Sequence, residues 1–240
     1  MTRYFFIHIM RTGGRTFSRQ VEHNFPRGSY FPDADHEADL VRANISVGDL
    51  LALPAERRAS LRLYSGHFPF YVTDELGGGF VMMTILRHPV ARTISHLQTR
   101  HSVLMQRPSF VERGLSIEDL YAIDGMGNGL LRDFQVRQFA LTGDDRLRSI
   151  DPLEVDDARF ETAIANLARV DVIGLQEQTE RFKAEVAERF GWTLPPIDDV
   201  HVSPRVEVSE SLRARIAEDN ATDVRFYEHA LELVRARTGD

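Results

Sequence analysis

The 240-residue chain contains no cysteine, which excludes disulfide bonds and thiolate metal sites. It has no run of about 18 apolar residues, the length that a membrane-spanning helix requires. No charged leader with a cleavage site precedes the first apolar segment. The sequence also lacks a Ser/Gly-rich linker, an internal repeat and a low-complexity tract. We therefore expect a soluble, cytoplasmic protein with a single domain that covers residues 1–240.

A surplus of positive charge is also absent. The chain has 29 basic and 36 acidic residues, which gives a formal net charge of −7. Because nucleic-acid-binding proteins usually carry a basic surplus, we expect no nucleic-acid partner. The nine histidines are scattered, and none forms a convincing metal-binding pair with a carboxylate, so we predict no metal site.

Residues 4–17 combine an apolar strand, a paired-glycine turn and the start of a helix. Gly13 and Gly14 let the backbone bend sharply and approach a ligand closely. Consecutive N–H groups and the positive end of the helix can then face one oxyanion. Four neighbouring side chains add hydrogen-bond donors: Arg11, Thr12, Arg15 and Thr16. The pattern predicts an anion site, and its plainer alternative is an ordinary turn before a helix.

This turn does not have the G-x-x-x-x-G-K-[ST] pattern of a nucleoside triphosphate loop. Ile9 stands where the first glycine is required, and Arg15 stands where the lysine is required. Both departures disfavour a kinase or an NTPase. A shorter phosphate-binding turn after the first strand is the remaining interpretation.

A second strand, turn and helix follow in residues 79–96. The apolar run from Phe80 to Leu86 is typical of a strand buried on both faces, and Pro89 suits the first position of a helix. Arg87 then lies at the strand end, with Ser95 about two turns along the helix. The planar guanidinium of an arginine suits a phosphate dianion. A surface turn with a solvated serine is the alternative.

Between these segments, a short apolar strand beginning at Leu63 ends with Gly66 and His67. Histidine is the side chain whose unperturbed pKa lies nearest physiological pH, so it can take the proton of an attacking hydroxyl group. A lone histidine at a strand end is more often structural. The two flanking anion turns favour a catalytic role for His67.

Together the three segments resemble the PAPS-dependent sulfotransferases, especially the branch that contains heparan sulfate 2-O-sulfotransferase and its bacterial relatives. PAPS is 3′-phosphoadenosine 5′-phosphosulfate. The opening motif of that family reads roughly Pro-Lys-Thr-Gly-Gly-Thr-Ser. In this chain Met10 replaces the proline and Arg11 the lysine, while Arg15 and Thr16 replace the final Thr-Ser pair.

The resemblance implies a three-layer, P-loop-like α/β fold with a central, mainly parallel sheet flanked by helices. It also implies transfer of a sulfuryl group from PAPS to a hydroxyl group, with release of PAP and no metal. The acceptor would be a saccharide, a lipid headgroup or a small metabolite. Residues 101–168 match the family poorly and are expected to be a helical insertion on the acceptor side.

The resemblance assigns a role to each candidate residue. His67 is the implied general base, and Arg11 would stabilise the leaving phosphate oxygen. The 5′-phosphosulfate would be held by Arg11, Thr12, Gly13, Gly14, Arg15 and Thr16. The 3′-phosphate would be held by Arg87 and Ser95. A later loop would contact the adenosine end through Ser203 and Arg205.

The sequence leaves two alternatives to a sulfotransferase. The change from lysine to arginine at Arg11 keeps open a catalytically silent protein that binds PAP or another nucleotide. The other alternative is a kinase-like phosphotransferase with a degenerate P-loop. The missing glycine and lysine of the P-loop pattern disfavour it.

The sequence also predicts the elements outside these motifs. We expect helices at residues 46–58, 116–123, 128–139, 177–190 and 220–237, and a strand at 170–175. Arg132 and Arg137 lie in the third of these helices, where a solvated helix face is the expected position for both.

Overall fold

In the computed structural model, the described residues are 1–32, 46–124, 129–145, 153–197 and 206–239. They contain one five-stranded sheet, with all strands parallel, in the order β2-β3-β1-β4-β5. Its strands are β1 (Arg3–Ile7), β2 (Tyr30–Phe31), β3 (Leu63–Gly66), β4 (Phe80–Leu86) and β5 (Val172–Leu175). This confirms the predicted α/β fold with a central parallel sheet. Because the strands are parallel, their carboxyl ends share one edge, which is where open α/β sheets bind ligands.

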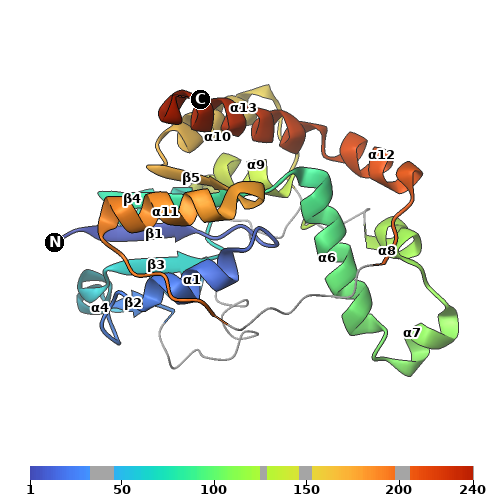
Figure 1. The fold of residues 1–240 in the computed structure, drawn as a ribbon, viewed down its shortest axis with the longest axis horizontal. Coiled ribbons are helices and arrows are strands. Elements are labelled where there is room, and N and C mark those ends of the chain that lie inside the picture. Colours follow the sequence, from blue (N-terminus) through green and yellow to red (C-terminus); the bar gives the residue numbers. More distant parts are fainter. Residues whose placement is uncertain (33–45, 125–128, 146–152, 198–205, 240) are drawn as a thin grey trace.

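Helices cover both faces of the sheet, giving three layers (Figure 1). Along β1, Phe5 and Ile7 point to one face and Phe6 to the other, as the period of a strand requires. The face of Phe6 packs against α1 (Gly14–Glu22) and α11 (Thr179–Phe190). The face of Phe5 packs against three helices: α9 (Phe134–Ala140), α10 (Asp157–Ala168) and α13 (Ala221–Thr238).

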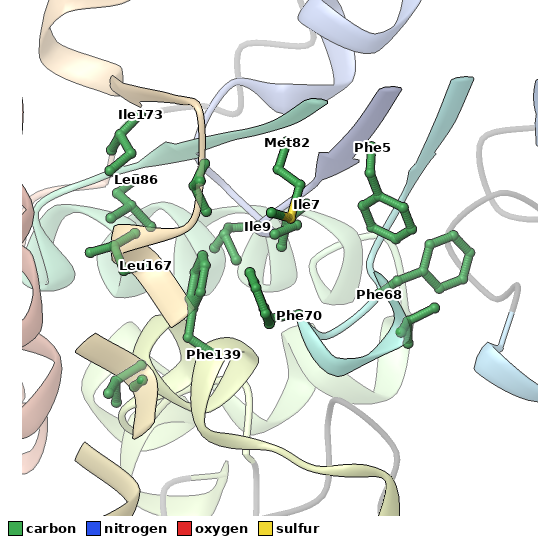
Figure 2. Close-up of a cluster of buried hydrophobic side chains, with 14 of the residues drawn as sticks. Phe5, Ile7, Ile9, Phe68, Phe70, Met82, Leu86, Phe139, Leu167 and Ile173 are labelled. Atoms are coloured by element: carbon green, nitrogen blue, oxygen red, sulfur yellow. The ribbon is translucent and has the colours of Figure 1, made fainter. Parts of the chain in front are cut away.

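The larger of the two cores lies on the face of Phe5. Figure 2 shows Phe139 and Phe70 directed toward the sheet residues Ile7, Met82 and Leu86. All these side chains are at least nine-tenths buried, and removing their apolar surface from water stabilises this layer.

A helical lobe extends from the carboxyl edge of the sheet (Figure 1). It comprises α6 (Pro89–Leu104), α7 (Pro108–Arg113), α8 (Ile117–Asp124) and α12 (Glu210–Asp219), which share a separate hydrophobic cluster. The first residue of α6 is Pro89, as predicted. Within residues 101–168, α7 and α8 belong to this lobe, whereas α9 and α10 pack against the sheet.

The prediction of one helix at 46–58 is wrong. The structure has two short helices there, α3 (Val47–Leu51) and α4 (Ala55–Ser60), because Pro54 has no N–H to donate within a continuous helix. The predicted helix at 128–139 begins only at Phe134. The structure also contains α5 (Tyr71–Glu75) and the 3₁₀ turns η2 (Gly143–Asp145) and η3 (Gln176–Gln178). Over the described ranges, none of the helices has the length and apolarity needed to cross a membrane.

Candidate functional site

The turn between β1 and α1 has an unusual backbone. Gly13 precedes α1 with φ 85°, and Arg11 has φ 70°, a region that side chains rarely adopt. The buried Thr12 donates its hydroxyl hydrogen to the carbonyl oxygen of Ile9 at 2.8 Å. This hydroxyl therefore shapes the turn itself. Arg15 and Thr16 lie in the first turn of α1, both partly buried.

The two predicted anion turns meet at the carboxyl edge of the sheet. Nε and Nη2 of Arg11 donate to Oγ of Ser95 at 3.3 Å and 3.1 Å. Nη1 of Arg87 donates to the carbonyl oxygen of Arg11 at 3.1 Å. These contacts connect residues 76 and 84 positions apart, because β1 and β4 are neighbours in the sheet. Arg11, Arg87 and Ser95 thus form one cluster, which we call the arginine cluster.

The arginine cluster brings like charges together. The pKa of Arg11 is lowered, first by burial and then by the positive charges of Arg87 and Arg15. Both effects disfavour the charged form of a guanidinium, which nevertheless stays protonated at any physiological pH. An anion bound here would replace the lost hydration and offset the repulsion.

The backbone of Arg87 is fixed by a residue that the sequence did not single out. Gln135 accepts the N–H of Arg87 through Oε1 at 3.0 Å and donates Nε2 to the carbonyl oxygen of Arg87 at 2.8 Å. The next residue, His88, donates its N–H to Oε1 of Glu177 at 3.0 Å. The motif gave no signal for Gln135, because the two segments come together only through the packing of α9 against the sheet.

Arg92 lies close enough to the arginine cluster for the charges of Arg87 and Arg11 to act on it. Its side chain is fully buried, donates to the carbonyl oxygen of Leu130 at 2.6 Å, and lies 5.0 Å from the centre of the Phe134 ring. Burial lowers the pKa of Arg92 to about 10, and the negative charge of Asp223 partly offsets this by raising it. Burial also raises the pKa of Asp223 to about 6, although its carboxylate accepts the N–H groups of Gln135 and Val136. Arg92 thus joins α6 to the segment before α9.

The candidate base, His67, directly follows β3. Its Nδ1–H donates to the carbonyl oxygen of His8 at 2.7 Å, because a carbonyl oxygen can only accept. In the neutral ring this leaves the lone pair on Nε2, and no hydrogen bond joins Nε2 to any of the described residues. Burial lowers the pKa of His67, partly opposed by the bond to His8. The ring is therefore held in the tautomer that a general base needs.

His8 is a site residue that the sequence analysis missed. Its ring centre lies 4.3 Å from that of His67, at the carboxyl end of the neighbouring strand. The pKa of His8 lies well below its usual value, first because the ring is buried and then because His67 and Arg15 are close. The available signal was its position at the end of an apolar strand, three residues before Arg11.

Four other arginine and serine predictions have different outcomes. Arg132 is exposed and lies 3.4 Å from the carboxylate of Asp219, as expected for a solvated face. The same expectation is wrong for Arg137, which is buried and donates to the carbonyl oxygens of Asp133 and Gly129. Ser203 and Arg205 lie outside the described residues.

The fold and this geometry define an α/β protein with an arginine-rich candidate anion site at the carboxyl edge of a parallel sheet. No protein-family model matches the chain, and a search of curated proteins finds no significant match.

Proposed function

We propose that this chain is a PAPS-dependent sulfotransferase that acts on a hydroxyl group of a saccharide, a lipid headgroup or a small metabolite. The observation that carries the proposal is the contact of Arg11 with both Ser95 and Arg87. It brings the residues expected for the 5′-phosphosulfate and the 3′-phosphate into one cluster. A donor with phosphate groups at both positions needs such adjacent cationic groups.

In this proposal, Arg87 and Ser95 bind the 3′-phosphate, and the N-terminal amides of α1 bind the 5′ end together with Arg15 and Thr16. Gln135 supports Arg87 by holding its backbone from both sides. The guanidinium of Arg11 stabilises negative charge on the oxygen that leaves sulfur. The arginines and amides supply the positive charge of the site.

His67 acts as the general base. PAPS supplies an activated sulfur whose bond to the 5′-phosphate oxygen is weak. As the acceptor oxygen forms its bond to sulfur, Nε2 of His67 takes the hydroxyl proton, and the electron pair of the broken S–O bond passes to the 5′-phosphate oxygen. The tautomer fixed by the His8 carbonyl provides the lone pair for this step.

One observation favours a catalytically silent PAP-binding protein as the second candidate. The guanidinium of Arg11 is hydrogen-bonded to Ser95. An arginine also cannot adopt the compact geometry of the lysine in the family motif. PAP binding without sulfate transfer to any hydroxyl acceptor would support this candidate.

The first experiment compares the binding of PAP and ATP, each with and without magnesium, and then assays sulfate transfer from PAPS to a panel of hydroxyl acceptors. We expect metal-independent binding of PAP in preference to ATP. Arg87→Ala should weaken PAP binding by about tenfold or more, the loss of one charge-assisted bond. Arg132→Ala, which removes an exposed arginine, is the control. Magnesium-dependent ATP consumption without sulfate transfer would instead indicate a phosphotransferase.

A further inference from the structure

The ring of His8 lies between the β1–α1 turn and His67. The ring centroids of His8 and His67 are 4.3 Å apart. On the turn side, a Cβ atom added to Gly14 would lie 2.2 Å from Cδ2 of His8 and 2.6 Å from Nε2. The first residue of α1 must therefore be glycine for the ring to occupy this position. A near-parallel stack with Phe6 at 5.5 Å fixes the ring plane.

In the proposed function, this position borders the path of the transferred group. In the proposed function, the turn at Gly14 holds the leaving phosphate end of the donor, and His67 receives the proton of the acceptor. The sulfuryl group would move from the one toward the other, past the edge of the His8 ring. We infer that His8 is a further catalytic residue, whose imidazole donates one N–H to an oxygen of the transferring sulfuryl group. This inference rests on the proposed sulfotransferase function.

The surroundings of His8 keep its ring neutral. Burial, the ring of His67 and the guanidinium of Arg15 all lower the pKa of His8. The positive end of α1, which begins at Gly14 against the ring, also disfavours a charged imidazole. A neutral imidazole carries one N–H donor and does not transfer that proton readily. Neutral histidines at helix N-termini can polarise an oxygen of a substrate in this way. His8 would stabilise the charge on the sulfuryl oxygens without competing with His67 for the proton.

His8→Phe tests this role, because it removes the N–H donor and keeps a planar ring. We expect kcat to fall by roughly 10²-fold, the typical loss for one donor to a developing oxyanion. PAP affinity should stay within about threefold, since PAP has no sulfuryl group. The ratio of PAPS to PAP affinity, measured without acceptor, should differ between this variant and the wild type, because only PAPS carries the sulfuryl group that His8 contacts.

Two further variants separate catalysis from packing. His8→Asn keeps an N–H donor in a smaller side chain and should recover part of the lost kcat. His23→Phe makes the same ring exchange at the exposed C-terminal end of α1 and should behave as the wild type. A residue that only packs would change thermal stability and leave the ratio of PAPS to PAP affinity unchanged.

The outcomes distinguish this inference from the function on which it rests. A wild-type protein that neither binds PAPS nor transfers sulfate would overturn both. A wild-type protein that transfers sulfate, with His8→Phe equally active or with an unchanged ratio of PAPS to PAP affinity, would overturn only the role of His8.

Discussion

At the scale of single residues, Arg11 combines two unfavourable features. Its φ of 70° lies in the left-handed region, which costs a non-glycine residue roughly 1–2 kcal/mol. Burial first, and then the positive charges of Arg87 and Arg15, lower the pKa of its guanidinium. Strain of this kind concentrates at functional sites, where the side chain is kept for a ligand rather than for stability.

Arg11→Gly should therefore separate stability from binding. Glycine adopts this backbone without strain and removes one of the like charges, so we expect the free energy of unfolding of the ligand-free protein not to fall. PAP affinity should fall about tenfold or more, because a charge-assisted donor is lost. Asp133→Gly is the contrast: Asp133 also has positive φ, but its carboxylate accepts the N–H of Asp223 at 2.8 Å, so this variant should be less stable. Denaturant unfolding and PAP titration measure both quantities.

His67 gives a prediction about pH. The base works only when its ring is neutral, and burial lowers its pKa from the ordinary value. The lowered pKa keeps the ring neutral to a lower pH, so the acidic fall of kcat/KM should have its midpoint below about 6.5. His67→Ala should reduce kcat by roughly 10²–10⁴-fold and abolish this acidic limb, with PAP affinity preserved. An unchanged pH profile in His67→Ala would rule out His67 as the base.

At the scale of elements, the start of α1 is set by contact with the end of β1. Gly14→Ala should destabilise the protein by about 1–3 kcal/mol, because the new methyl group would overlap the His8 ring. In a helix, this exchange would otherwise be favourable. Gly48→Ala in α3 is the matched control, since its Cβ would come no closer than 3.4 Å to Oγ of Ser46. Equal stability of the two variants would contradict the close packing of His8 against α1.

The sequence predicted the elements whose signals are local. The apolar run of β4 and the proline after it predicted the bounds of that strand and the first residue of α6. The turn at Gly13 and the position of Ser95 on α6 were predictable for the same reason. Arg137 and Gln135 were not, because their burial depends on how α9 packs against distant segments. His8 was missed because one histidine in an apolar segment has the same local pattern whether it packs or binds.

At the scale of the whole molecule, the anion site opposes the overall charge. The chain has a net charge of −7, yet three arginines gather at one edge of the sheet. Lys183 is the sole lysine in the sequence, so arginine supplies almost all of the positive charge. Because arginine does not titrate at physiological pH, the cationic character of the site is constant there. PAP binding should accordingly change little between about pH 7 and about pH 9, because the pKa of arginine lies far above this range.

A bound anion should stabilise the whole domain by relieving the repulsion within the arginine cluster. A ligand at about 100 times its Kd adds about 2.7 kcal/mol to the free energy of unfolding. For a domain of this size, each kcal/mol raises Tm by roughly 2–4 °C, so saturating PAP should raise Tm by roughly 5–11 °C.

AMP, which lacks the 3′-phosphate, should give a smaller shift, and Arg87→Ala should reduce the PAP shift toward that of AMP. Thermal unfolding with each nucleotide at low and high salt measures these effects, and added salt should diminish them because the attraction is electrostatic. If AMP and PAP stabilised the wild type equally, Arg87 and Ser95 would not be the site of the 3′-phosphate.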